Sequence, residues 1–283
     1  MTRRIGMNLL LWGGDITARH APLIDQLAAI GFDGVEVPVG GQPRDELNVL
    51  RGTAEDAGLA VTCSTFIPDE VNPIAADPAI RAKSVPYLKQ RIEEAAFMGS
   101  DILIGGIYQA HKAFTGKAPT QDEWNWSRDY LRAAAEHGQK FNVRLGLEFL
   151  NRFEVHLINT SADAARMCDD VGMDNVGVLY DTHHANIEEP EASSAIKALA
   201  QSGHLMHMHM SESHRGTLGT GQVDWEGTRN GLADAGYDDW LVIESFGMLD
   251  PGMVSAANLW RNCFDDELQV ARDGLAFLRN RFC

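Results

Sequence analysis

Four side chains that lie far apart in the sequence are of the types that bind metal ions and move protons, and each lies at the end of a short apolar run. They are Glu148, Asp181, His209 and Glu244. A charge that is isolated among apolar residues is costly to bury, so these side chains need partners. Three carboxylates and one imidazole suit Mn²⁺ or Mg²⁺ better than a structural zinc site, which favours cysteine and histidine. If the four runs converge, they form a site for a divalent cation.

The apolar runs that carry these residues alternate with amphipathic stretches along the whole chain. Most runs are too short for helices and are rich in Val, Ile and Leu, which is typical of buried parallel strands. The predicted strands are Ile5–Trp12, Gly34–Val39, Ala60–Phe66, Asp101–Tyr108, Arg144–Leu150, Val176–Thr182, His204–Ser211 and Leu241–Phe246. The helical stretches include Ala21–Ile30, Asp45–Ala57, Ile80–Met98, Glu123–His137, Ala162–Val171 and a long C-terminal helix at Asp265–Arg279.

Eight strands that are each followed by a helix predict an α/β fold, a single (β/α)8 TIM barrel with an extra C-terminal helix. The 283 residues could make two domains, but α/β barrels often reach about 250 residues as one domain, and no linker interrupts the series. We therefore expect one domain over residues 1–283. In such barrels the C-terminal ends of the strands meet at one mouth, where barrel enzymes build their active sites.

The composition disfavours several kinds of partner. Lys and Arg number 24 against 40 Asp and Glu, a net charge of −16, and no basic block is present, so nucleic acid is not an expected partner. No apolar stretch reaches the ~18 residues of a membrane span, so we expect no membrane partner. The cysteines have no C-x-x-C spacing and indicate a reduced, cytoplasmic protein. They are Cys63, Cys168, Cys263 and Cys283.

Other polar residues near the strands have less specific interpretations. A single Glu at a strand end, such as Glu36, is more often an ion-pair or capping partner than a metal ligand. Strand alternation puts His207 and His209 on one face, with His209 nearer the mouth, so we expect His207 to pack behind the site. Met206 and Met208 share the opposite face and are expected to point toward the helices.

Two neighbouring histidines follow the sixth predicted strand. His183 and His184 point in opposite directions if the strand continues through them, so only one can face the site. The glycine-rich segment 216–221 lacks the spacing of a phosphate-binding loop, and we expect it instead to let the backbone pass close to a ligand. The remaining histidines are expected in loops or on the surface: His20, His111, His137, His156 and His214.

Several stretches at the strand ends also carry a family resemblance. They are Leu147–Glu154, Asp181–Glu189, His207–His209, Glu212–Gly216 and Ile243–Phe246, together with Gly6-Met7, Trp12 and Leu259–Arg261. In these stretches the sequence resembles the ketose 3-epimerases, the group of D-tagatose and D-psicose (allulose) 3-epimerases within the xylose-isomerase-like TIM barrels. The similarity covers essentially the whole chain, and the N-R-F-E and D-T-x-H-x-N-I-E-E stretches are specific.

The resemblance implies roles for individual residues. One divalent ion per subunit, Mn²⁺ ahead of Mg²⁺ or Co²⁺, would be bound by Glu148, Asp181, His209 and Glu244. The choice of His209 over His207 follows the H-x-H-x-x-E-x-x-R stretch. The two catalytic bases would be Glu148 and Glu244. The C1–C3 oxygens of the substrate would be held by Glu154, His184 and Arg215.

The activity that the resemblance implies is inversion of C3 of a free ketopentose or ketohexose by a homodimer or homotetramer. The C3 proton lies next to the C2 carbonyl, which the metal would polarise, so an enediolate can form. One Glu can remove the proton and the other return it on the opposite face, provided that their pKa values differ.

Related activities stay open beside this one. The same barrel could be an aldose–ketose or hydroxypyruvate isomerase, or an epimerase or isomerase of a 3-keto sugar derivative. A barrel endonuclease that uses a metal cluster on DNA would need further His or Asp ligands and a basic groove.

Some positions depart from the family pattern. Asn8 stands where an aromatic residue is usual, Leu9–Leu11 replace a more aromatic run, and His183 stands where Phe is common. The loops after the third and fourth strands also differ. These positions shape the far end of the sugar pocket, so we expect them to affect substrate choice more than metal chemistry.

Overall fold

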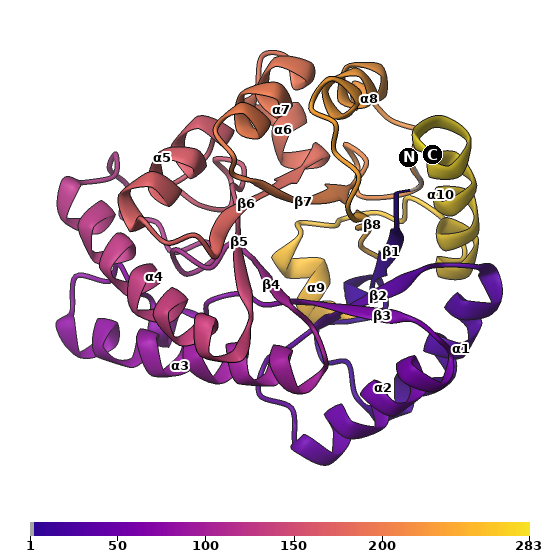
Figure 1. Ribbon diagram of the computed structural model, residues 1–283, viewed down its shortest axis with the longest axis horizontal. Coiled ribbons are helices and arrows are strands. Elements are labelled where there is room, and N and C mark those ends of the chain that lie inside the picture. The colour runs from indigo at the N-terminus through magenta and orange to yellow at the C-terminus, as the bar shows by residue number, and fades with distance from the viewer. Residues whose placement is uncertain (1–2) are drawn as a thin grey trace.

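The computed structural model describes residues 3–283. Its centre is a closed barrel of eight parallel strands, in which each strand pairs with the next and β8 pairs with β1 (Figure 1). The strands are β1 (Ile5–Asn8), β2 (Gly34–Pro38), β3 (Ala60–Ser64), β4 (Ile102–Gly105), β5 (Arg144–Glu148), β6 (Val176–Asp181), β7 (Leu205–Met210) and β8 (Leu241–Ile243). The prediction of a (β/α)8 TIM barrel is confirmed.

Helices form a ring around the outside of the barrel, except α9, which lies over one end of the barrel (Figure 1). They are α1 (Ala21–Ile30), α2 (Arg44–Asp56), α3 (Pro78–Phe97), α4 (Gln121–Phe141), α5 (Ser161–Val171), α6 (Thr182–Glu188), α7 (Ala192–Gln201), α8 (Trp225–Asp234), α9 (Pro251–Ala256) and α10 (Glu267–Phe282). The C-terminal helix α10 packs against β1 and β8 and lies beside the start of the chain, because the guanidinium of Arg3 donates to the carbonyl of Phe282. Within residues 3–283, every helix is too short or too polar to span a membrane.

Local signals in the sequence set the ends of these helices. Thr120 and Glu123 form a capping box at the start of α4, in which the two side chains accept each other's backbone N–H at 3.2 and 2.7 Å. At the end of α1, Gly31 has a φ of 107°, which a residue with a Cβ rarely adopts. Within α1, Ile24 and Leu27 are fully buried, and each such burial contributes about 1.5–3 kcal/mol.

All eight strands end one to four residues before their predicted ends, and in two of them a side chain caps the turn that follows. Asn8 ends β1 by accepting the N–H of Leu10 on its Oδ1 at 2.8 Å, so the next three residues form a 3₁₀ helix. Asp181 ends β6 by accepting the N–H groups of His183 and His184 at 2.5 and 3.4 Å. This cap begins α6, a helix that the sequence pattern does not predict.

One residue of β7 has no partner in β6. Val178 pairs with Leu205 and Leu179 pairs with His207, which leaves Met206 between them unpaired. Met206 packs against a cluster that includes Leu179 on the inner face of the barrel. The expectation that Met206 faces the helices is wrong, because a bulge interrupts the alternation on which it depends.

Candidate metal centre and active site

The ends of four adjacent strands bring the predicted metal ligands together. They are Glu148 at the end of β5, Asp181 at the end of β6, His209 near the end of β7 and Glu244 directly after β8. All four side chains are buried, and one ligand atom of each lies within 4.8 Å of the others. These four residues, here called the carboxylate cluster, could hold a metal ion. Their oxygen-rich donor set suits a hard divalent cation.

His209 presents an unbonded nitrogen to the rest of the cluster. Its Nδ1 is buried and has no hydrogen-bond partner. This atom lies 3.3 Å from Glu244 Oε1, 3.8 Å from Glu148 Oε1 and 3.9 Å from Asp181 Oδ2. Burial lowers the pKa of His209, but the carboxylates of Glu36 and Glu244 outweigh burial and hold the pKa well above its ordinary value. A buried nitrogen among three carboxylates is an arrangement that a bound cation would complete.

The two candidate bases have opposite electrostatic environments. Burial raises the pKa of Glu148 to about 8, and the nearby Glu244 adds to the rise. Burial also acts to raise the pKa of Glu244, but His209 and Arg215 outweigh it and hold that pKa below its ordinary value. At neutral pH, therefore, Glu148 keeps a proton and Glu244 is ionised. A pair with separated pKa values can supply one acid and one base.

Arg215 supplies positive charge at the barrel mouth. Its Nη1 donates to Glu244 Oε2 at 2.8 Å, to Asp181 Oδ2 at 3.1 Å and to Ser211 Oγ at 3.0 Å. The backbone of Arg215 has a φ of 63°, which is uncommon for a residue with a side chain. The ion pairs hold the residue in this conformation, and strained backbone of this kind concentrates at functional sites.

A cavity of about 440 Å³ opens above the carboxylate cluster. This volume is in the range of small-molecule binding sites. The three predicted substrate-binding residues line the cavity together with the two candidate bases: Glu154, His184, Arg215, Glu148 and Glu244. The predicted residues are thus brought to one place, where a single small molecule can touch all five.

Polar contacts hold the predicted sugar-binding residues in place. Glu154 accepts from Asn151 Nδ2 at 2.9 Å and lies 3.2 Å from His111 Nε2. Burial lowers the pKa of His184 to about 3, so this imidazole is neutral. His183 does not line the cavity, and its Nδ1 lies 3.2 Å from a backbone carbonyl of the loop after β7. His111, which we expected only in a loop or on the surface, lines the cavity, and its place after a barrel strand is the signal that could have found it.

The glycine-rich segment 216–221 wraps around a carboxylate of the chain itself. Glu212 accepts the N–H of Gly219 at 2.9 Å and the Nε1–H of Trp225 at 3.1 Å. A Cβ at Gly221 would lie only 2.4 Å from Glu212 Oε1, so that position requires a glycine. No residue of this segment lines the cavity. The expectation that it approaches a ligand is therefore wrong for this cavity, because the N–H of Gly219 is taken by Glu212 and that of Gly216 by His214.

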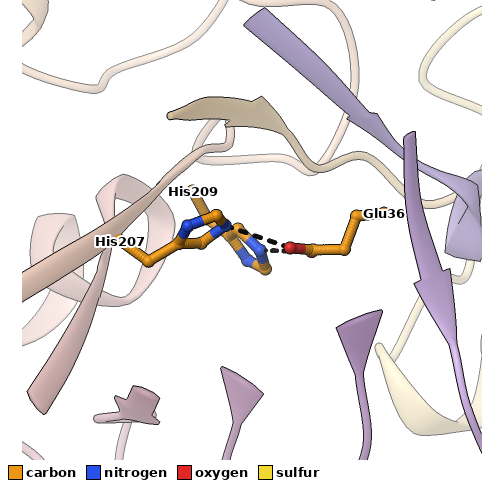
Figure 2. Close-up of side chains that lie close together, drawn as sticks. All are labelled: Glu36, His207 and His209. Atoms are coloured by element: carbon orange, nitrogen blue, oxygen red, sulfur yellow. Dashed lines mark hydrogen bonds and ion pairs between the residues drawn. The ribbon is translucent and has the colours of Figure 1, made fainter. Parts of the chain in front are cut away.

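A second group of buried polar residues lies deeper in the barrel. Figure 2 shows the carboxylate of Glu36, on β2, pointing across the barrel to the imidazoles of His207 and His209 on β7. Glu36 Oε1 lies 2.6 Å from His209 Nε2, and Glu36 Oε2 lies 3.0 Å from His207 Nε2. Asn8 Nδ2 and Thr62 Oγ1 donate to the same carboxylate at 2.8 and 3.0 Å. We call Glu36, His207, Asn8 and Thr62 the Glu36 network.

The sequence indicates part of this network. Glu36 is an ion-pair partner, as expected, but it lies in the middle of β2 and not at a strand end. The signal was a lone carboxylate between Val35 and Val37, which strand alternation turns inward. His207 lies behind His209, as expected. Asn8 contacts Glu36 below the cavity and does not line the cavity itself.

Comparison with known proteins relates this site to a family. The family model of the xylose isomerase-like TIM barrels matches residues 24–281. The chain is 32% identical to the L-ribulose 3-epimerase of Mesorhizobium japonicum over 280 residues, which cover 97% of this chain and 93% of that protein.

Solved structures agree with this relationship. A structure of L-ribulose 3-epimerase matches with a TM-score of 0.93 and 32% identity, and the match covers 99% of this chain and 95% of that one. The D-allulose 3-epimerase of a Methylomonas species in complex with D-allulose matches with a TM-score of 0.92 and 26% identity, over 99% of this chain and 98% of that one. The chain is therefore an enzyme of the isomerase class, and it belongs to the ketose 3-epimerase family of xylose isomerase-like TIM barrels.

Proposed function

We propose that this chain, as one barrel domain, is a divalent-metal-dependent ketose 3-epimerase that inverts C3 of a free ketopentose or ketohexose. The observation that carries the proposal is the pair Glu148 and Glu244. Both line the cavity, both belong to the carboxylate cluster, and their pKa values are displaced in opposite directions. Membership of the ketose 3-epimerase family supports C3 of a ketose as the reacting centre.

The carboxylate cluster would hold the metal ion, with Mn²⁺ preferred over Mg²⁺ or Co²⁺. When bound, a divalent cation supplies the positive charge that polarises the ketose carbonyl and stabilises an enediolate. Two features support the fit of a cation to this cluster. The Nδ1 of His209 is buried without a partner among the described residues. The three carboxylates outnumber the positively charged groups beside them, which are Arg215 and, when protonated, His209.

Glu148 and Glu244 would move the proton. In the direction that starts from their resting protonation states, the ionised Glu244 removes the proton from C3, and the electron pair moves onto the C2 carbonyl. Glu148 then delivers its own proton to the opposite face of C3, which inverts the centre. In the reverse direction the two residues exchange roles.

The other cavity residues would position the sugar. Glu154, His184 and Arg215 present a carboxylate, a neutral imidazole and a guanidinium, which suit the oxygens of C1–C3. Away from the cluster the lining includes the apolar Leu10 and Phe66. Within the described residues, Arg215 is the only Lys or Arg that lines the cavity. This lining favours a neutral sugar over a phosphorylated one.

The test is to incubate the purified protein with free ketopentoses and ketohexoses in deuterated water, with Mn²⁺ and with a chelator. We expect the 3-epimer and deuterium at C3 with Mn²⁺, and neither with the chelator. Deuterium at C1 or C2 in place of C3 would indicate an aldose–ketose isomerase. Absence of exchange on every free ketose would contradict the proposal and direct the search to 3-keto sugar derivatives.

We also propose that the protein is a cytoplasmic homodimer or homotetramer. Large apolar side chains are exposed in segments that follow β3, β5 and β8, on the side of the mouth: Phe66, Phe153, Leu249 and Trp260. Contact with a second copy would remove them from water. Four cysteines that form no disulfide suit a reducing compartment.

A further inference from the structure

The Glu36 network contacts the carboxylate cluster at the imidazole of His209, and more distantly where Asn8 Nδ2 donates to Glu244 Oε1 at 3.4 Å. The Nε2 of this imidazole lies 2.6 Å from Glu36 Oε1, and its Nδ1 faces the carboxylates of the cluster. Glu36 is fully buried and does not line the cavity. Because Glu36 cannot touch a sugar in the cavity, any effect that it has on the reaction passes through its neighbours.

Glu36 is placed to act on His209 and not to bind an ion itself. The ligand atoms of Glu36, His207 and His209 lie close together, but they already contact one another at 2.6 and 3.0 Å. Asn8 and Thr62 donate to the same two oxygens. With two donors on each oxygen, the carboxylate has no free position for a cation.

We propose that Glu36 is a positioning residue for His209: it accepts the Nε2–H of this imidazole and thereby leaves Nδ1 as the nitrogen that binds the metal ion. A neutral imidazole has one N–H and one lone pair, and the partner of one nitrogen decides the state of the other. An ionised carboxylate can only accept, so Nε2 must donate. This inference rests on the metal-dependent function proposed above.

The carboxylate of Glu36 is itself held in place by its other donors, so it can fix the orientation of the His209 imidazole. Asn8 Nδ2 donates to Oε1 of Glu36 and Thr62 Oγ1 donates to Oε2, so both oxygens of the carboxylate act as acceptors. Its donors come from β1, β3 and β7, and the orientation of the carboxylate therefore follows from the barrel and not from a mobile loop. Side chains that orient a metal-binding histidine in this way typically change metal affinity about 10- to 100-fold when they are replaced.

The first experiment compares Mn²⁺ binding to chelator-stripped E36Q and to the parent protein by calorimetry. Gln has the size of Glu, but it is neutral and keeps only one acceptor oxygen for the donors that surround Glu36, so it holds Nε2 as the donor less firmly. We expect affinity to fall about 10- to 100-fold in E36Q. The matched control is T62V, which removes a donor from Oε2, the oxygen that does not contact His209. T62V should weaken Mn²⁺ binding much less than E36Q, whereas a purely structural role of the network predicts comparable losses.

The second experiment asks whether Glu36 acts through His209. E36Q is combined with H209N, and Mn²⁺ affinity is measured for both single variants and the double variant. We expect E36Q to add little to the loss already caused by H209N, because the imidazole that it would position is gone. An undiminished effect of E36Q in the H209N protein would overturn the proposal, since Glu36 would then act on the cluster by another route.

The third experiment needs no substitution at Glu36 and so stands even if E36Q folds poorly. Nitrogen NMR of the Mg²⁺-loaded parent protein, with the His209 signals assigned by their loss in H209N, reports which ring nitrogen carries a proton. We expect a protonated Nε2 and an unprotonated Nδ1; the reverse pattern would overturn the proposal. A stripped parent protein that binds no divalent cation would overturn the metal-dependent function together with this inference. Equal binding by parent and E36Q would overturn the inference alone.

Discussion

The barrel interior holds two groups of buried polar residues that differ in how completely their charges are matched. In the Glu36 network, a single carboxylate receives four donors, and its pKa is held below the ordinary value by the histidines beside it. In the carboxylate cluster, three carboxylates gather around one imidazole nitrogen that has no hydrogen bond. There burial raises the pKa of Glu148 to about 8.

The comparison separates residues that support a site from residues that react. The carboxylate of Glu36 has two donors on each oxygen and gains nothing from a ligand, although the Nδ1 of His207 behind it is buried without a partner among the described residues. The incompletely paired carboxylate cluster is costly until a ligand completes it. The two groups meet at one imidazole, His209, whose Nε2 contacts Glu36 and whose Nδ1 has no hydrogen-bond partner among the described residues. Each prediction below changes one side of this contrast.

The largest effect is expected when either candidate base loses its charge. E148Q and E244Q should each lower the rate of epimerisation about 10²- to 10⁴-fold, because each removes a proton donor or acceptor from one face of C3. Each variant should still exchange the C3 proton of one epimer with solvent, since the remaining Glu can remove a proton from its own face. The measurements are product formation and deuterium incorporation, started from each epimer separately.

The control for these variants is E55Q, which neutralises an exposed carboxylate on α2. It should leave both rates close to those of the parent protein. If E148Q and E244Q instead lost exchange from the same epimer, the two residues would not lie on opposite faces of C3, and the assignment of two bases would be wrong.

A smaller effect, on stability, is expected when a cation completes the carboxylate cluster. Mn²⁺ at about 100 times its Kd should raise the free energy of unfolding of the stripped protein by about 2.7 kcal/mol. D181N should lose most of this gain, while D129N, on the exposed face of α4, should keep it. Urea denaturation with and without Mn²⁺ measures the difference. An equal gain in D181N would show that the ion binds elsewhere.

Part of this architecture could be predicted from the sequence. The carboxylate cluster could be predicted, whereas the partners of Glu36 could not. The four members of the carboxylate cluster could be named because each breaks an apolar run near its end, and barrel topology brings all such ends to one mouth. For a residue in the middle of a strand, the topology does not indicate which side chains it will contact. Glu36 breaks an apolar run just as clearly, but its partners lie on β1, β3 and β7, and sequence distance does not specify which inward side chains meet across the barrel.

Local hydrogen bonds, a bulge and an irregular loop account for several of the remaining differences. The early ends of β1 and β6 depend on the side chains of Asn8 and Asp181 accepting backbone N–H groups, which the strand pattern of the surrounding residues conceals. The inward turn of Met206 depends on a bulge against β6, which only pairing can reveal. His111 lies in an irregular loop, where no periodicity predicts the direction of a side chain.

A still smaller effect is expected on the pH dependence of folding stability, because the pKa of Glu148 is raised in the fold. In the unfolded chain the pKa of Glu148 takes its ordinary value near 4.5, and in the fold it rises to about 8. Between these values the folded protein holds a proton that the unfolded chain lacks, so the stability from this group falls as the pH rises. In chelator, the stability of the parent relative to E148Q should fall by about 1.4 kcal/mol for each pH unit near pH 6–7, measured by urea denaturation.

Glu154 provides the matched control for this prediction, because its pKa lies below the ordinary value and its carboxyl is ionised in both states near neutral pH. E154Q should therefore leave the slope of stability between about pH 6 and pH 7 unchanged. A parent protein with the same slope as E148Q would mean that Glu148 is ionised in the fold, and the separation of the two bases would need another cause.

The smallest effect on the fold is expected at the surface, where apolar side chains are exposed near the mouth and at the opposite end of the barrel. Trp260, near the mouth, is 74% exposed, and Phe141, at the end of α4 on the opposite side, is 41% exposed. Replacing either residue by Ser should change the free energy of unfolding of a subunit by less than about 0.5 kcal/mol, since neither is packed in the core. Light scattering should show that W260S weakens the homo-oligomer and that F141S does not. If F141S dissociates the oligomer and W260S leaves it intact, the subunits meet at the closed end, and the apolar residues around the mouth serve the cavity alone.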